Sequence, residues 1–230
     1  MELSEILKAS QQRFHPLFNP DLDPENTFLP DLSEGNRQLH TLDFTDTAGL
    51  GRLIFDELHR KNAVYAYGGY LEDRAVYKRS PLFKASGKQA RSIHLGTDIW
   101  AEANTPVYLP HEGVIHSFGN NDKYGDYGPT IIVRHQLGDT AFYTLYGHLT
   151  IDSLNDKTAG MPLRTGEVLC HIGEAPDNGD WPPHLHFQVI ADMQGWSGDF
   201  PGVCTRQELS RYRKICPDPV VFFPKLNPEE

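Results

Sequence analysis

Between residues 99 and 190 the chain alternates short apolar runs with glycine- and proline-rich turns, and this pattern most constrains the fold. Residues 130–135 and 140–146 alternate in polarity around Leu137-Gly-Asp139, which is typical of a β-hairpin. Further strands are predicted at 105–110, 114–118, 167–172 and 184–190. We expect the first two of these to pair with each other around a tight turn. Because no long helical pattern interrupts the strands, we predict a mainly β fold with an antiparallel sheet or sandwich core.

The N-terminal residues 1–62 differ from the rest and predict a helical and irregular extension. The strongest helical pattern covers 46–62, with an apolar stripe on one face and Asp46 or Thr47 as the N-cap. A shorter helix is expected from Ser4 to Phe14, with Ser4 as its cap. The proline-rich stretch between the two helices is expected to be an irregular arm.

The sequence divides into three predicted parts. The extension covers 1–62, a β domain that carries the chemistry covers 63–190, and a proline-rich tail packed on the core covers 191–230. The tail contains one short polar helix candidate around 205–214. The main boundary is set where the hydrophobic period changes from helical spacing to the two-residue spacing of strands.

Charge and cysteine content limit the partners. The chain has 21 basic and 31 acidic side chains and a formal net charge of −10. This acidity argues against binding to nucleic acid or to an anionic membrane, because both need clustered basic residues. The three cysteines leave one unpaired in any disulfide scheme, and neither a signal peptide nor a membrane-spanning run is visible. We therefore expect a cytoplasmic protein without nucleic-acid or membrane partners, of undetermined oligomeric state.

The run His184-Leu-His186 is the first candidate site. Residues at i and i+2 on a strand face the same way, so both imidazoles point to one place while Leu185 and Phe187 face the core. Two histidines on one polar face are either a surface coincidence or part of a metal site, and this run alone does not decide between them.

The run His94-Leu-Gly-Thr-Asp98 is the second candidate. On a straight strand its histidine and carboxylate would stand too far apart to share an ion, but Gly96 allows the chain to bend. With one histidine of the strand pair they would form the three-ligand set of a hydrolytic zinc site. His148 follows a predicted strand and is either a surface residue or a further imidazole that orients water or stabilises an oxyanion.

Other catalytic motifs are not matched. His111-Glu-Gly-Val-Ile-His116 has one residue too many for the HExxH zinc motif, and Gly195-Trp-Ser-Gly198 lacks the spacing of a nucleophile elbow. Ser86-Gly-Lys88 lacks the flanking residues of a phosphate-binding loop. The remaining histidines are expected to be surface or structural residues: His15, His40, His59, His111, His116, His135 and His171.

Four short motifs, in order, resemble one known family. They are HLGTD at 94–98, TPV at 105–107, YGHL at 146–149 and PHLHF at 183–187. Together they resemble the LytM/lysostaphin-type zinc metallopeptidases, whose core is the groove-forming duplicated hybrid motif fold. The resemblance covers about residues 65–190.

The resemblance implies a ligand set and a division of roles. It implies one Zn²⁺ per chain, held by His94, Asp98 and His186. His184 would then be the general base. His148 would be the partner that steadies the attacking water or the oxyanion.

The chain departs from this family in several respects. Members are commonly exported, whereas no signal is visible here, and Glu commonly stands where this chain has Gln188. The segments at 70–77, 181–183, 198–202 and 217–219 resemble instead the metallopeptidase-like module inside some intracellular aminotransferase fusion proteins. This second resemblance makes cell wall a less natural substrate.

Two functions follow as hypotheses. The first is a zinc metalloendopeptidase that hydrolyses short peptide or amide bonds, with peptidoglycan-derived peptides as the default substrate. The second is a non-hydrolytic, metal-containing module that binds a small ligand or a partner protein. The second is motivated by the extension 1–62, which could cover the groove, while Tyr65, Tyr67, Tyr70 and Tyr77 either line the groove or pack in the core.

Overall fold

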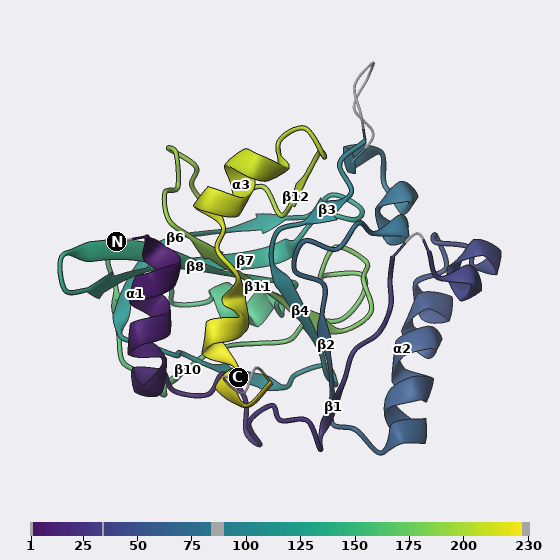
Figure 1. The fold of residues 1–230 in the computed structure, drawn as a ribbon, viewed down its shortest axis with the longest axis horizontal. Coiled ribbons are helices and arrows are strands. Elements are labelled where there is room, and N and C mark those ends of the chain that lie inside the picture. The colour runs from purple at the N-terminus through teal and green to yellow at the C-terminus, as the bar shows by residue number, and fades with distance from the viewer. Residues whose placement is uncertain (1, 34, 84–89, 227–230) are drawn as a thin grey trace.

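The computed structural model describes residues 2–33, 35–83 and 90–226. Within these residues an eight-stranded sheet dominates the fold (Figure 1). In spatial order its strands are β1 (Thr27–Phe28), β2 (Tyr65–Gly68), β4 (Thr97–Trp100), β11 (His184–Ile190), β8 (Thr140–Gly147), β7 (Gly128–Leu137), β6 (Gly113–Asn121) and β9 (Pro162–Leu163). Neighbouring strands are antiparallel, except that β1 and β2 run parallel. The prediction of a mainly β fold is confirmed, and the sheet is mixed.

Smaller elements complete the described chain. Two further pairs of strands are β3 (Ile93–His94) with β12 (Val203–Cys204), and β5 (Pro106–Tyr108) with β10 (Val168–His171). The α-helices are α1 (Leu3–Ser10), α2 (Thr47–Lys61) and α3 (Leu209–Ile215). Short 3₁₀ turns lie at Gln11–Arg13, Arg37–Thr41, Ala75–Arg79, Pro81–Phe83, Ile151–Leu154, Pro219–Phe222 and Pro224–Leu226. None of the described helices is both long and apolar enough to span a membrane.

The predicted hairpin of β7 and β8 is confirmed, whereas the predicted pairing of β5 with β6 is wrong. Strands β7 and β8 pair across the predicted turn. Strand β5, expected to pair with β6, pairs with β10 instead, while β7 and β9 occupy both edges of β6. The reason is that β9 pairs with Gly113 and Val114 of β6, the residues next to the turn where a hairpin with β5 would begin. The turn after β5 reverses the chain without joining the two strands into a hairpin.

The N-terminal predictions need two corrections. Glu2 rather than Ser4 caps helix α1. The Glu2 side chain accepts a hydrogen bond from the backbone amide of Glu5, and the Glu2 amide donates one to the Glu5 carboxylate. The helix ends at Ser10. The proline-rich arm also contains β1, whose two residues pair with β2. Two residues are too few to show an alternating pattern in the sequence.

Helix α2 forms where its pattern predicts it. Asp46 is the N-cap and accepts a hydrogen bond from the Gly49 amide at 2.9 Å. Asn62 ends the helix in the left-handed conformation. In Figure 1 this helix stands beside the edge of the sheet formed by β1 and β2, on the opposite side of the molecule from α1.

Strand β11 is buried along its whole length and separates two parts of the interior. Leu185 and Phe187, as expected, pack in the larger core cluster, which also includes Phe222 of the C-terminal tail. The histidines and Gln188 alternate with these residues and therefore lie on the other face of the sheet. The division of the chain into 1–62, 63–190 and 191–230 stays a prediction.

Candidate metal centre

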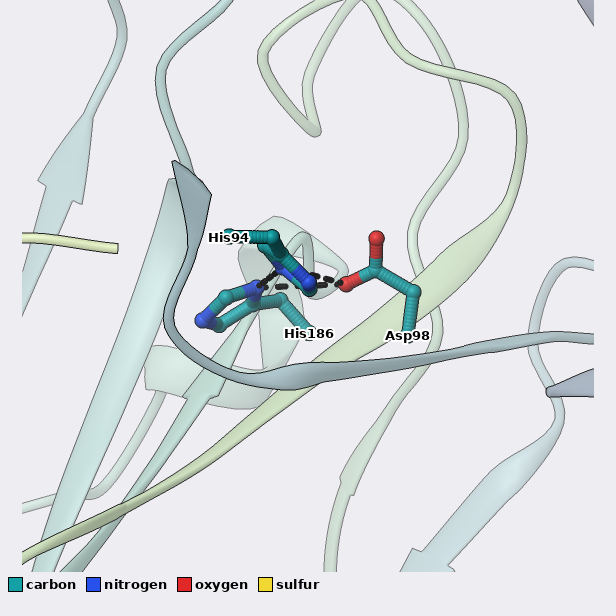
Figure 2. A group of neighbouring side chains, drawn as sticks. All are labelled: His94, Asp98 and His186. Carbon is teal, nitrogen blue, oxygen red and sulfur yellow. Dashed lines mark hydrogen bonds and ion pairs between the residues drawn. The ribbon is translucent and has the colours of Figure 1, made fainter. Parts of the chain in front are cut away.

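Three potential metal ligands meet on the face of the sheet opposite the larger core (Figure 2). His94 Nε2 lies 2.9 Å from His186 Nδ1 and 3.3 Å from Asp98 Oδ1. His186 Nδ1 lies 3.2 Å from the same carboxylate oxygen. The structure thus brings together the three residues that the sequence analysis named as ligands.

The backbone explains how residues so far apart in sequence meet. His186 on β11 lies directly opposite Asp98 on β4, so their side chains are cross-strand neighbours. His94 ends β3, and the break between β3 and β4 falls at Gly96. A Cβ atom at Gly96 would lie only 2.7 Å from the His186 ring. Glycine is therefore needed here for close approach as well as for the bend.

Hydrogen bonds on the far side of each ring fix the tautomers of the two ligand histidines. His94 Nδ1 lies 3.0 Å from the Gly69 carbonyl oxygen, which can only accept, so Nδ1 carries the proton. His186 Nε2 lies 2.9 Å from Gln188 Oε1 and donates to it in the same way. The lone pairs of His94 Nε2 and His186 Nδ1 are therefore directed toward each other.

This donor set suits a divalent cation. Two lone pairs and a carboxylate oxygen at 2.9–3.3 Å, with no proton between the two nitrogens, repel one another unless a cation lies among them. Tetrahedral zinc with bonds of about 2.0–2.2 Å separates its ligand atoms by about 3.3–3.5 Å. The observed separations come close to that spacing, and three protein ligands leave a fourth position open, as in catalytic zinc sites.

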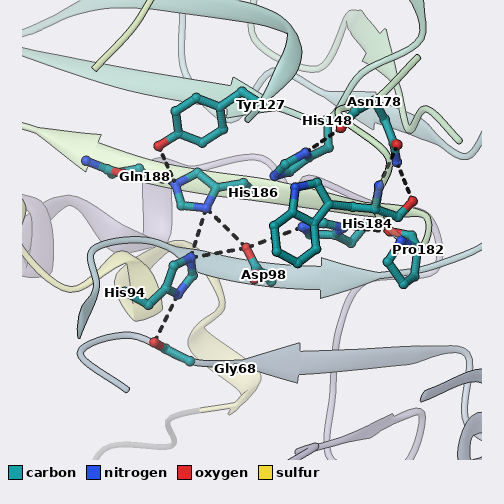
Figure 3. Close-up of polar contacts among 12 residues, drawn as sticks. Gly68, His94, Asp98, Tyr127, His148, Asn178, Pro182, His184, His186 and Gln188 are labelled. Carbon is teal, nitrogen blue, oxygen red and sulfur yellow. Dashed lines mark hydrogen bonds and ion pairs between the residues drawn. The ribbon is translucent and has the colours of Figure 1, made fainter. Parts of the chain in front are cut away.

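Two more imidazoles stand beside the ligand cluster (Figure 3). His184 Nδ1 donates to the Pro182 carbonyl at 2.7 Å, and His148 Nδ1 donates to the Asn178 carbonyl at 2.8 Å. Their ring centroids are 4.2 Å apart, and His184 Nε2 lies 3.9 Å from Asp98 Oδ1. In both rings the proton sits on Nδ1, so Nε2 presents a lone pair.

His148 occupies a strained backbone conformation at the end of β8. Its φ angle of 62° lies in the left-handed region, which costs a non-glycine residue about 1–3 kcal/mol. Hydrogen bonds hold it on both sides: its amide donates to the Tyr127 carbonyl at 2.8 Å, and its carbonyl accepts from Gly173 at 2.8 Å. Residues held in this way are concentrated at functional sites.

Burial keeps His94, His148 and His184 neutral. Burial, together with the positive charge of Arg74, lowers the pKa of His94 to about 3. Burial likewise lowers the pKa of His184, and it holds the pKa of His148 well below the usual value. Burial alone would raise the pKa of Asp98, but the positive charge of Arg74 holds it well below its ordinary range. Neutral imidazoles and an ionised carboxylate are the forms that bind a metal.

Arg74 lies next to this centre, although no motif in the sequence indicates it. Its side chain is 3% exposed, forms an ion pair with Asp98 Oδ2, and donates from Nε to Glu72 Oε2 at 2.8 Å. It also lies over the ring of Trp100 at 5.6 Å. Asp98 is thus held through both oxygens, with Oδ2 on the guanidinium and Oδ1 facing the two imidazoles.

Other parts of the site carry no sequence signal. Tyr127, whose hydroxyl lies 3.4 Å from His186 Nε2, and Asn178 stand in turns without a recognisable motif. Of the four tyrosines considered for the groove, only Tyr77 lines the cavity of the described structure, and Tyr65 and Tyr67 pack in the larger core. The remaining seven histidines do not line this cavity within the described residues.

A buried cluster of two histidines and one carboxylate, with further imidazoles beside it, is a kind of site that metal-dependent hydrolases use. Residues 92–197 match the family model "Peptidase family M23", and this part of the chain belongs to that metallopeptidase family. The resemblance to LytM/lysostaphin-type metallopeptidases is thereby confirmed.

The chain is similar to several individual proteins over part of its length. The chain is 34% identical over 128 residues to an L-Ala--D-Glu endopeptidase of Bacillus subtilis (strain 168), which covers 53% of this chain and only 37% of the relative. Among solved structures it is similar to the catalytic domain of lysostaphin from Staphylococcus simulans (21% identity, TM-score 0.37, 53% of this chain and 80% of that one). It is also similar to a zinc-containing peptidase from Vibrio cholerae (24% identity, TM-score 0.35, 48% and 31%).

Proposed function

We propose that the chain is a zinc-dependent metalloendopeptidase that hydrolyses short peptide or amide bonds, with peptidoglycan-derived peptides as its substrate class. One observation carries the proposal: the lone pairs of His94 and His186 and one oxygen of Asp98 converge at 2.9–3.3 Å, beside two neutral imidazoles. Family membership and the relative named as an L-Ala--D-Glu endopeptidase support it.

In this proposal His94, Asp98 and His186 hold one zinc ion. The ion supplies Lewis acidity toward the scissile carbonyl and lowers the pKa of a water molecule toward about 7. The donor atoms, two nitrogens and one oxygen, are those that zinc commonly takes in hydrolytic sites, and this supports zinc over manganese, which prefers oxygen.

His184 is the general base of the proposed reaction. Its Nδ1 proton is committed to the Pro182 carbonyl, so its Nε2 lone pair is available to take a proton from water. That nitrogen lies 3.9 Å from the ligand oxygen of Asp98, which places it beside the ligand atoms. The lowered pKa of His184 keeps the lone pair free near neutral pH.

His148 orients the water in this proposal. Its Nδ1 proton is committed to the Asn178 carbonyl, so a neutral His148 presents an acceptor rather than a donor at Nε2. An acceptor can hold a water O–H but cannot donate to a developing oxyanion. The family resemblance implies that His148 steadies either the attacking water or the oxyanion. While His148 is neutral, this geometry supports the first of these two roles.

Metal analysis combined with a peptide-library cleavage assay on the full chain tests the proposal. His184→Ala should keep stoichiometric zinc and lose turnover by about 10²–10⁴-fold, the usual contribution of a general base. His171→Ala, at an exposed histidine outside the cavity, is the matched control and should keep full activity. Zinc-loaded protein that cleaves no peptide would support the alternative, a metal-containing binding module.

We also propose a cytoplasmic location. All three cysteines (Cys170, Cys204 and Cys216) are buried as free thiols, which supports a reducing compartment. Fractionation of the native host tests this, and recovery of the protein outside the cytoplasm would contradict it.

A further inference from the structure

The candidate metal centre opens into a single cavity of about 270 Å³. His148, His184 and His186 line it, and each is only 3–6% exposed. A substrate therefore has to enter this cavity to reach them. Leu32, Leu50 and Ile54 also line the cavity, and all three belong to the N-terminal segment 1–62 rather than to the β domain.

An apolar cover lines one part of the cavity beside the imidazoles, and the cavity stays partly open. Leu50 of α2, Val76, Tyr77, Trp181 and Val203 form one buried cluster. Tyr77 lies over His94 with ring centroids 6.2 Å apart, and the Trp181 ring is 6.1 Å from His148 and 6.3 Å from His184. Segments distant in sequence thus meet over the site, and α2 supplies part of the cover.

Helix α2 is fixed to the site rather than resting loosely on it. The Thr47 hydroxyl donates to the Asp180 carbonyl at 2.9 Å, and the helix passes so near Pro182 that a Cβ atom added at Gly51 would lie 3.8 Å from it. The Pro182 carbonyl in turn accepts the Nδ1 proton of His184. The wall that α2 forms is therefore tied to the segment that orients His184.

We propose that the N-terminal segment restricts the enzyme to short, free peptides and excludes polymeric peptidoglycan; this rests on the proposed peptidase function. At about 270 Å³ the cavity is smaller than most ligand pockets in proteins, which have volumes of about 300–1,000 Å³. A chain of n residues spans up to about 3.3–3.6 Å per residue, so a long extended strand would reach beyond this volume and meet the cavity wall, to which α2 contributes Leu50 and Ile54.

The two sides of the cavity suit a small peptide. The α2 side is apolar, with Leu32, Leu50 and Ile54, and takes a compact apolar side chain. Other lining residues carry charge of both signs, including Arg91 and Asp199, and suit the charged ends of a free peptide. A polymer offers such ends only rarely.

Binding of peptide hydroxamates of two, three, five and eight small residues tests the proposal by calorimetry on the zinc-loaded full chain. The dissociation constant should rise at least tenfold between three and eight residues. Equal affinity across the series would overturn the proposal, and so would failure of the two-residue compound to bind. Because this readout is binding, it decides the question even if the chain hydrolyses nothing, which would count against the proposed function alone.

Hydrolysis gives a second readout. Zinc-loaded protein should cleave soluble tripeptides and release nothing from insoluble peptidoglycan, and equal rates per bond on both substrates would contradict the restriction.

Substitutions in α2 test whether this helix forms the wall of the cavity that limits peptide length. Leu50→Ala should widen the cavity and reduce the discrimination between three and eight residues at least threefold. Leu58→Ala is the matched control, since Leu58 is equally buried in the same helix but does not line the cavity. Ile54→Val removes one methylene-sized group and serves as a milder probe of the same wall. Unchanged discrimination in Leu50→Ala and Ile54→Val would overturn the assignment of the wall to α2.

Discussion

Replacing Gly96 by alanine tests whether the bend between β3 and β4 builds the metal centre. The added Cβ would lie 2.7 Å from the Cε1 and Nε2 atoms of His186 and 2.8 Å from the Phe187 carbonyl oxygen. Carbon atoms in ordinary contact are about 3.5–4.0 Å apart, so the overlap is close to 1 Å. Neither neighbour can move easily, because His186 is held by Gln188 and Phe187 lies within the central strand.

The size of the effect follows from this overlap. Overpacking of a buried site costs about 1–3 kcal/mol, which we expect as a loss in the free energy of unfolding. The displacement falls on a ligand ring, so zinc affinity should drop by about 10–100-fold, as when the groups that orient a ligand are lost. Gly51→Ala is the control: its Cβ would meet Pro182 at 3.8 Å, and alanine is favoured within a helix.

Chelator competition and thermal unfolding give the two readouts for this pair. We expect Gly51→Ala to keep the zinc affinity of the original chain. Its melting temperature should be unchanged or higher. A Gly96→Ala variant that binds zinc as tightly as the original chain would refute the reasoning, because it would show that His186 is not confined by this close approach.

Three further predictions concern charge, pH and metal. Arg74→Met should lower the free energy of unfolding of the metal-free chain by about 3–5 kcal/mol in urea, because it leaves the Asp98 carboxylate unpaired and buried. Arg52→Met is the control, since it removes an exposed ion pair worth only about 0–1 kcal/mol. Burial lowers the pKa of His135 to about 4, so the unfolded chain binds more protons than the folded chain between about pH 6.5 and pH 4. The free energy of unfolding should therefore fall by up to about 3 kcal/mol as the pH drops through that window. His135→Gln should remove this part of the pH dependence of urea unfolding. Removing zinc with a chelator should lower the melting temperature by roughly 8–16 °C, compared with protein in a free zinc concentration about a thousandfold above the dissociation constant. Calorimetry measures this difference.

The sequence was informative where one strand's alternation decides the geometry. His184 and His186 had to share a face because successive residues on a strand point to opposite sides, and Leu185 and Phe187 had to enter the core. The bend at Gly96 was also predictable, since only a bend brings His94 and Asp98 together. The close approach of Gly96 to His186 was not, because it depends on a strand almost ninety residues away.

Other features depend on long-range packing that no local pattern records. A single arginine such as Arg74 gives no periodic signal, and its burial follows from Asp98, Glu72 and Trp100 meeting around it. The pairing of β5 with β10 rather than β6 likewise depends on strands distant in sequence, since β7 and β9 pair with β6. Helix α2 was predicted as a helix, but its position against the cavity could not be read from its own residues.

The position of Arg74 explains how the centre can be preformed. In small zinc domains the ligands repel one another without metal and the chain unfolds. Here the Arg74 guanidinium pairs with Oδ2 of Asp98 even without a metal, while Oδ1 faces imidazole nitrogens whose protons are turned away. The carboxylate charge is therefore compensated before any metal arrives. Removal of Arg74 should for this reason destabilise the metal-free chain more than the zinc-loaded chain, so that apparent zinc affinity rises as stability falls.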